Sequence, residues 1–322
     1  MHKHYAIILS AVVAGAGSGA LMVAVQPFLQ ENSRRRQRPY LFSMNFSLVL
    51  VMSIASGLLA GYLPGFFQNS GYFLLLSERG GLQASLMVGA GFMFLAFFPG
   101  IRLTGRGRTG TTGEPILEPS PAEAATAYAA MGKFMLTSAL IGVGAGMIVP
   151  YFNLYFQGWA GASVSQIGTV FALGQFGTAL GGISSPWLAR RLGLTNGVVL
   201  TQLSSLPFMA IMAWRHELWI CSFCFIFRGA FMNMGVPMRQ EKMMESISPQ
   251  FRARASAGDG MAWNLAWAAS MFFSGSLIRY WGYSASLWIT FLCYLVSGIL
   301  YFHFFREPQS PRSEPRPIPL NG

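Results

Sequence analysis

Nine apolar runs, each long enough to cross a lipid bilayer as a helix, dominate this chain of 322 residues. A crossing requires about 20 predominantly apolar residues, and runs of this length leave little sequence for an independent soluble core. The sequence therefore predicts an all-α fold, a polytopic membrane helix bundle. The runs cover approximately residues 5–29, 41–67, 82–100, 133–157, 164–188, 195–214, 217–242, 257–279 and 284–305.

The composition excludes several other classes of protein. The chain is 53% hydrophobic and only 10% charged, whereas a soluble domain carries roughly 25% charged residues. A soluble enzyme, a disordered chain and a disulfide scaffold are all excluded. Cys221 and Cys224 have the spacing of a redox or zinc motif, but they lie inside an apolar run without nearby basic residues. We expect them to be small packing residues.

The basic residues alternate between the two sides of the predicted bundle. The loops on one side, including the tail, hold 17 Lys and Arg, and those on the other side hold 4. Because cytoplasmic loops are enriched in Lys and Arg, this asymmetry predicts a cytoplasmic C-terminus and an external N-terminus. The net charge of +11 is then a consequence of topology, and no nucleic-acid partner is expected. The predicted location is the cell membrane, with multiple passes through the lipid bilayer.

A polar segment separates two groups of apolar runs. Residues 101–132 contain Gly, Thr, Pro and Glu without apolar periodicity, which is typical of a linker. The sequence predicts three spans in an incomplete N-terminal half over residues 1–100 and a cytoplasmic linker over 101–132. A six-span C-terminal half over 133–306 and a cytoplasmic tail over 307–322 would follow.

Two ordered matches indicate an internal repeat. Residues 19–31 align without gaps on residues 229–241, at an offset of 210, and residues 55–63 align on residues 269–277, at an offset of 214. Both copies run in the same direction, as in a parallel repeat about an axis along the membrane normal. Shared Gly and Ala composition is the alternative explanation. The repeat leaves the fourth to sixth spans without copies, so we expect the chain to correspond to the last nine spans of a twelve-span protein.

Two copies of one motif accompany this repeat. The first is Pro27-Phe-Leu-Gln-Glu31, followed by Arg38. The second is Pro237-Met-Arg-Gln-Glu241, followed by Arg252 and Arg254. With the three-plus-six arrangement and the linker, these motifs resemble the pattern at the cytoplasmic ends of two helices in the major facilitator superfamily of secondary transporters.

A third motif is also similar to that family, although it departs at one position. Residues 182–193, with Arg190 and Arg191, resemble the second copy of the family's basic loop, but Pro186 stands where the family has Asp. Residues 56–61 lack the Gly-Pro signature of drug/proton antiporters. The resemblance covers essentially the whole chain and leaves the subfamily open.

The resemblance implies transport of a small molecule by alternating access, with the binding site between the halves near the bilayer midplane. The substrate, a coupling proton or ion, the mode of transport and the oligomeric state remain open. No catalytic set or metal cluster can be assembled within the runs, so we expect neither an enzyme nor a cofactor. The alternatives are a similar membrane protein with a sensing or partner-binding role, and an inactive, N-terminally truncated fragment.

Polar side chains inside apolar runs are the candidates for the substrate cavity, because such groups are costly in lipid and usually face a bundle interior. An interhelical hydrogen bond is the alternative role for each amide. The resemblance places Gln26, Asn153, Arg228 and Asn233 on cavity-lining spans. Arg228 is the only charged residue well inside a span, and we expect it to point into the cavity. The full set is Gln26, Asn153, Gln175, Arg228, Asn233, Asn264 and Trp263.

Charged residues at the predicted cytoplasmic ends are candidates for a gate. The resemblance suggests that Glu241 pairs with Arg190 and Arg191 when the cytoplasmic side is closed. Alternatively, the two arginines serve only as topology anchors. The candidate set is Glu31, Arg38, Arg190, Arg191, Glu241 and Arg252.

Overall fold

A computed structural model describes residues 15, 17, 19–21, 23–69, 78–102 and 120–306. Within these ranges the chain is helical, without strands. Residues 15, 17, 19–21 and 23–31 are the described residues of a first helix. The elements that follow are α2 (Arg38–Asn69), α3 (Glu78–Arg102), α4 (Pro121–Ile148), the 3-10 turn η1 (Val149–Tyr151), α5 (Phe152–Gly158), α6 (Val164–Leu192), α7 (Leu194–Trp214), α8 (Leu218–Ser246), the 3-10 turn η2 (Pro249–Phe251) and α9 (Arg252–Phe305).

The predicted helical fold is confirmed, and most of the predicted spans match a helix closely. The run at 195–214, for example, corresponds to α7. The first predicted span, 5–29, lies largely outside the described residues. Among the described helices, six are long and apolar enough to cross a membrane, and α3 contains a further apolar stretch, Gln83–Ala96.

The expected linker is shorter than predicted at its C-terminal side. Helix α4 begins at Pro121, so residues 121–132 are helical. The Ser120 side chain accepts a hydrogen bond from the Glu123 backbone N–H, and the Glu123 carboxylate accepts one from the Ser120 N–H. This capping box satisfies backbone donors that a helix start would otherwise leave unpaired. Proline at the first position needs no such partner, because it has no N–H.

Helix α9 contains two predicted spans joined by a single non-helical residue. Gly282 has φ 77° and ψ 174°, a conformation that favours glycine because it has no Cβ. The first arm of α9 precedes Gly282 and the second arm follows it. Both arms pack against α4.

Three glycines allow this close packing of α4. A Cβ on Gly142 would lie 2.5 Å from the Trp263 carbonyl oxygen of the first arm, and a Cβ on Gly144 would lie 2.9 Å from the Tyr294 ring of the second arm. A Cβ on Gly146 would collide with the Ser270 hydroxyl. Such contacts between helix backbones are characteristic of small residues in membrane bundles.

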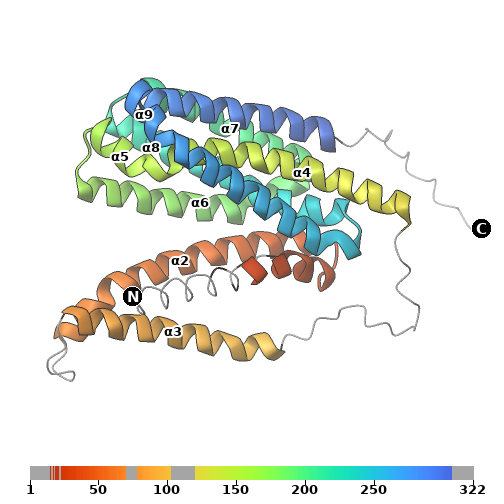
Figure 1. Cartoon of the computed structure of the whole chain (residues 1–322), viewed down its shortest axis with the longest axis horizontal. Coiled ribbons are helices and arrows are strands. Elements are labelled where there is room, and N and C mark those ends of the chain that lie inside the picture. Colours follow the sequence, from red (N-terminus) through yellow and green to blue (C-terminus); the bar gives the residue numbers. More distant parts are fainter. Residues whose placement is uncertain are drawn as a thin grey trace, which may run out of the picture.

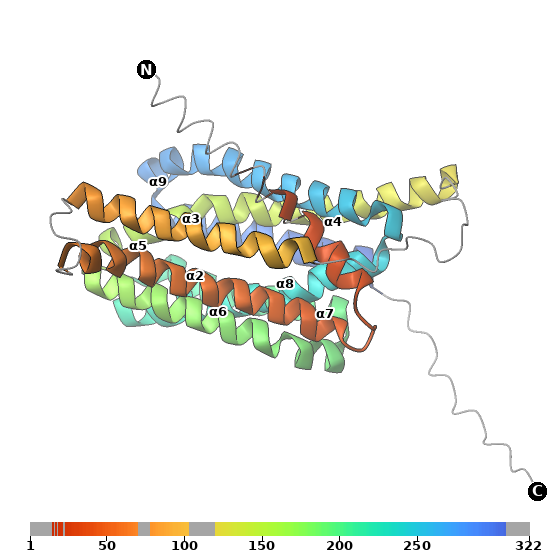
Figure 2. The ribbon, with the colours of Figure 1, turned by 90° about the horizontal axis from the view of Figure 1, so that it is seen from below.

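The helices form two groups (Figures 1 and 2). The N-terminal group consists of the first helix, α2 and α3, and the C-terminal group consists of α4 to α9. Helix α2 packs against α3 within its own group and against α6 and α8 of the other group. Helix α2 is therefore one connection between the groups.

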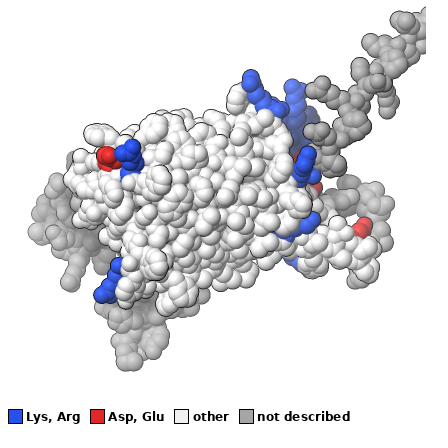
Figure 3. Space-filling view, turned by 90° about the horizontal axis from the view of Figure 1, so that it is seen from above, with Lys and Arg blue, Asp and Glu red and all other residues white. Residues whose placement is uncertain are grey.

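Charged side chains gather at the two ends of the bundle and leave a broad uncharged band between them (Figure 3). We call one end the basic end; it carries Arg190 near the end of α6, Arg252 at the start of α9 and Arg306 just after the end of α9. The opposite end carries Arg215 and Arg279. An uncharged, largely apolar band is what a helix bundle exposes to the hydrocarbon core of a membrane.

Candidate functional site

The two groups meet at the basic end of the bundle. The Ser256 hydroxyl, near the start of α9, donates a hydrogen bond of 3.1 Å to the Gln26 side-chain oxygen in the first helix. Arg35, in the turn before α2, lies 4.0 Å from the Glu245 carboxylate at the end of α8. The expected cavity residue Gln26 is therefore part of the contact between groups in this conformation.

Helices α2 and α6 form an antiparallel part of this contact. The Ser47 hydroxyl donates to the Ala179 carbonyl oxygen at 3.5 Å, and the guanidinium of Arg190 lies 5.2 Å from the centre of the Tyr40 ring. Between these points, Gly182 allows a close approach, because a Cβ there would be 2.8 Å from both the Phe46 ring and the Ser47 hydroxyl. Small residues thus set the separation of the groups.

The repeated motif brings its charges together in a reciprocal way. Arg38, from the first copy, is close enough to Glu241, from the second copy, to act on its charge. Arg252, which follows the second copy, is similarly close to Glu31 of the first. Each glutamate therefore has an arginine from the other repeat as a neighbour. Like charges are also near, because Glu245 acts on Glu241 and Arg38 acts on Arg252.

The predicted pairing of Glu241 with Arg190 and Arg191 is wrong for this conformation. Among the described residues, no ion pair joins them. Arg190 lies over Tyr40, and Arg191 lies 4.5 Å from the Trp187 ring centre. The physical reason is position: Glu241 is 3% exposed, whereas both arginines are at the exposed end of α6.

Beyond Ser47 and Ala179 the two groups separate. Val51 is one turn after Ser47 on α2 and is exposed, and Gln175 is one turn before Ala179 on α6 and is also exposed. Residues four apart lie on the same face of a helix, so these exposed side chains continue the contact faces away from the basic end. Figure 1 shows α2 diverging from α6 towards its Asn69 end. The expected cavity residue Gln175 thus lies where the groups have come apart.

Arg228 lies inside the C-terminal group and not on an exposed wall. It is 7% exposed, and its guanidinium lies 5.0 Å from the Phe152 ring centre and 5.7 Å from that of Phe225. Tyr294 is a polar neighbour that interacts with its charge. No acidic side chain in the described part of the chain pairs with Arg228. Contacts with aromatic faces stabilise the cation by about 2 kcal/mol or more where water is excluded.

The remaining cavity candidates are not brought into one cluster. Asn153, Gln175 and Asn264 are exposed, on α5, α6 and α9, whereas Asn233 and Trp263 are half-buried. The Asn264 amide donates to the Gly260 carbonyl oxygen at 2.7 Å. The Asn233 amide donates in the same way to Gly229, at 2.9 Å. These two amides bond within their own helices, and within the described residues neither has an interhelical hydrogen bond.

A buried ion pair in the C-terminal group was missed by the sequence reasoning. Arg239 of α8 donates two hydrogen bonds to the Asp259 carboxylate of α9, of 2.9 and 2.8 Å. The side chains are 13% and 15% exposed. Ser138 donates to the same carboxylate at 2.7 Å, and Arg239 also donates to the Phe134 carbonyl oxygen at 2.9 Å. The signal that could have revealed this pair is an acidic and a basic residue at similar depths in consecutive predicted spans.

This ion pair has no counterpart in the first copy of the repeat. Subtracting the offsets of 210 and 214 places Leu29 and Asn45 at the positions of Arg239 and Asp259. In the second copy the pair connects α4, α8 and the first arm of α9, and the Ser297 hydroxyl links the second arm to α4 through the Thr137 carbonyl oxygen at 3.0 Å. The ion pair is therefore a specific stabilising feature of the C-terminal group.

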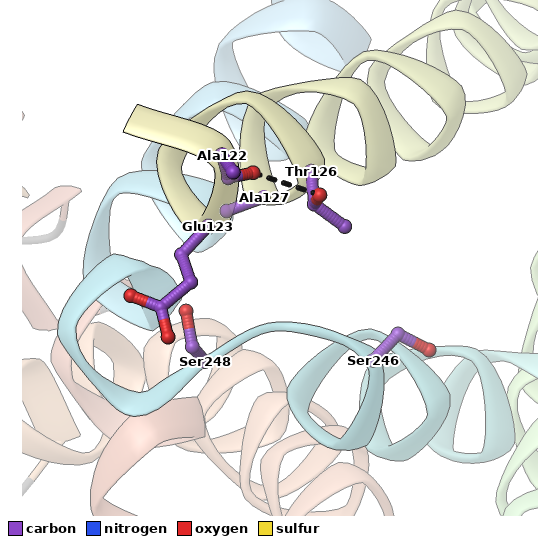
Figure 4. Close-up of a pocket in the computed structure, with 6 residues that line it drawn as sticks. All are labelled: Ala122, Glu123, Thr126, Ala127, Ser246 and Ser248. Carbon is purple, nitrogen blue, oxygen red and sulfur yellow. Dashed lines mark hydrogen bonds between the residues drawn. The ribbon is translucent and has the colours of Figure 1, made fainter. Parts of the chain in front are cut away.

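Two open pockets lie at the basic end. One, of about 340 Å³, lies between the start of α4 and the end of α8, where the Thr126 hydroxyl donates to the Ala122 carbonyl oxygen (Figure 4). The other, of about 230 Å³, includes Arg306 and the turn between α6 and α7. Neither pocket contains a cavity candidate, so we assign no substrate to them. The described residues also contain no group of acidic, His or Cys side chains that could hold a metal ion.

The helical fold, the apolar band and the two groups of helices define a multi-pass membrane protein of the transporter class. The profile of the Major Facilitator Superfamily matches residues 134–321, which is more than half of the chain. The chain therefore belongs to the major facilitator superfamily, and it is a membrane transporter.

Comparison with solved structures gives the same fold. The chain is similar to the "Crystal structure of a bacterial homologue of iron transporter ferroportin in outward-facing state", with a TM-score of 0.72 and 16% sequence identity. The alignment covers 92% of this chain and 71% of the other. At this identity the similarity concerns the fold. No curated protein matches the sequence.

Proposed function

We propose that the chain moves a small molecule across the cell membrane by alternating access, and that the conformation described above is closed at the basic end and open at the opposite end. The observation that carries this proposal is that the two groups touch at the basic end, where the Ser256 hydroxyl donates to the Gln26 side chain and the charge of Arg38 acts on Glu241. A contact built from two repeats can be made or released by rotating one group against the other. The similarity to an outward-facing structure supports the same assignment.

We propose that the basic end is cytoplasmic, with the C-terminus on that side. The support is the concentration of Arg and Lys at that end, which follows the positive-inside rule. The substrate would enter from the opposite end and meet the diverging faces of α2 and α6. Gln175 is then a substrate contact, and Asn153 and Asn264 are candidates that share its exposure.

Arg228 has a positioning role in this proposal. It lies under Phe152, the first residue of α5, at the point where η1 interrupts the helix. Arg228→Gln should sharply weaken transport while membrane insertion remains normal, because a neutral amide interacts weakly with the two aromatic rings. Arg228→Lys is the control, since it retains a cation. Unchanged transport by the glutamine variant would remove Arg228 from the mechanism.

A charge exchange tests the gate. Arg38→Glu and Glu241→Arg, made separately, should each release the contact at the basic end, because each places like charges beside one another. The double exchange should restore it. The measurement is the rate at which a cysteine placed at Ser47 reacts with an impermeant maleimide in inside-out vesicles. Equal rates in all four proteins would contradict the gate.

A further inference from the structure

The contact between the two groups buries polar side chains that have no protein partner. Ser43 of α2 is 3% exposed and Ser185 of α6 is 1% exposed, and neither hydroxyl has a hydrogen-bond partner among the described residues. Gln30 of the first helix is also 1% exposed, and both polar atoms of its amide lack a partner in the described part of the chain. Buried polar groups in proteins are nearly always paired, so these three side chains need an explanation.

The two serines lie in the same layer of the contact. Ser47 of α2 donates a hydrogen bond to Ala179 of α6. Nearer the basic end, Tyr40 of α2 contacts Arg190 of α6. Ser43 lies between Ser47 and Tyr40, and Ser185 lies at the corresponding point between Ala179 and Arg190. The hydroxyls therefore belong to facing segments of α2 and α6, yet they do not bond to each other.

Glu241 extends this polar layer towards the gate. It is 3% exposed, and one carboxylate oxygen lacks a hydrogen-bond partner within the described residues. Arg38, whose charge acts on Glu241, precedes Ser43 by five residues, or about 7.5 Å along α2. The layer thus combines hydroxyl, amide and carboxylate groups from four helices, two in each group.

We infer that the closed contact between the groups is a hydrated one, in which water bridges Ser43, Ser185 and their polar neighbours. A bridging water needs two to four polar partners, and this layer supplies them. Water-mediated bonds satisfy the buried groups but exchange readily for bulk water when the groups separate. Opening then exposes hydroxyls that water can solvate at once. Through this layer the closed state stays close in free energy to the open one.

The inference rests on the proposed alternating access, and it predicts the effect of removing the hydroxyl groups that hold the bridging water. Replacing both serines by alanine removes the hydroxyls and should stabilise the closed state, because no polar group is then left to lose its hydrogen bonds on burial. In Ser43→Ala with Ser185→Ala, the cysteine at Ser47 should react about tenfold more slowly from the basic end than in the protein with both serines. Each single alanine variant should give a smaller reduction.

Ser222 provides a matched control. Its hydroxyl is also buried without a partner in the described part of the chain, but it lies on α8 at the end opposite the gate. Ser222→Ala should leave the labelling rate unchanged. Gly182→Val should raise the rate, because its side chain would push against Phe46 and Ser47. The protein without a cysteine at position 47 gives the background from the native cysteines, of which Cys221 and Cys224 are buried.

The outcomes separate the two hypotheses. Unchanged or faster labelling in the double alanine variant would overturn the hydrated layer, and so would an equal reduction in Ser222→Ala. No labelling in any variant, Gly182→Val included, would contradict alternating access itself.

Radiolytic labelling gives a second measurement, since hydroxyl radicals formed from bound water oxidise nearby rings. Phe46 should be oxidised in the native protein and protected in the double alanine variant; an unoxidised Phe46 in the native protein would show that the layer is dry.

Discussion

The interior of the C-terminal group and the contact between the two groups are built in different ways. Inside the C-terminal group, α4 lies against both arms of α9 through glycines, and the Arg239 guanidinium donates two hydrogen bonds to the Asp259 carboxylate. Between the groups, the contact is confined to one end, and Ser43 and Ser185 are buried without protein partners. The difference indicates that one region must hold a single arrangement, whereas the other must release.

The largest effect on this difference is expected when one partner of the buried ion pair is removed. Asp259→Leu should destabilise the protein by about 3 to 5 kcal/mol, because it leaves the Arg239 guanidinium buried without a counter-charge. Arg239→Met with Asp259→Leu should recover much of that loss. The measurement is a double-mutant cycle of thermal unfolding in detergent. Additive losses in the double variant would contradict a direct pairing.

A second variant tests the glycine packing of α4. Gly146→Val should cost about 1 to 3 kcal/mol or more, since overpacked side chains must displace their neighbours and a Cβ here meets the Trp267 carbonyl oxygen at 2.5 Å. The readout is the yield and melting temperature of monodisperse protein. Gly132→Val, on the same helix with open space around its Cα, is the control. Similar losses in both variants would show that helix propensity, not packing, is responsible.

The contact between the groups should respond differently to the same kind of change. Gly182→Val should increase labelling of a cysteine at Ser47 severalfold and lower the melting temperature only slightly, because the groups can move apart to accommodate the side chain. Gly168→Val on the same helix, where a Cβ meets nothing within 4 Å, should do neither. A large loss of stability in Gly182→Val would mean that the contact is as rigid as the C-terminal interior.

The smallest effect is expected at the exposed edge of the contact. Arg35 is 89% exposed in its ion pair with Glu245, and exposed pairs contribute about 0 to 1 kcal/mol. Glu245→Gln should therefore change unfolding in detergent and labelling at position 47 by less than twofold. A larger change in labelling would show that Glu245 acts through its neighbour Glu241.

Much of this fold could be predicted from the sequence, because long apolar runs and alternating charge each report one strong physical requirement. The early start of α4 was also readable, since Ser120 followed by Glu123 is a capping-box pattern. The gate was harder. Arg190 and Glu241 are both at the right end of the bundle, but sequence spacing cannot show that Glu241 is buried while Arg190 lies over Tyr40.

The polar layer was beyond reach for another reason. Ser43 and Ser185 are small residues in apolar runs, and such residues usually serve helix packing. Only the register of α2 against α6 brings them opposite one another. The Arg239 and Asp259 pair was hidden because the sequence places both residues near the predicted membrane edge, where charges commonly face water.

The single-residue turn at Gly282 also bears on how the chain enters the membrane during synthesis. A connection of one non-helical residue provides no slack between the arms of α9 in the folded protein. We therefore expect the two segments to enter together as a helical hairpin. Lengthening this connection with a flexible insert should let the two arms enter one after the other instead of as a pair.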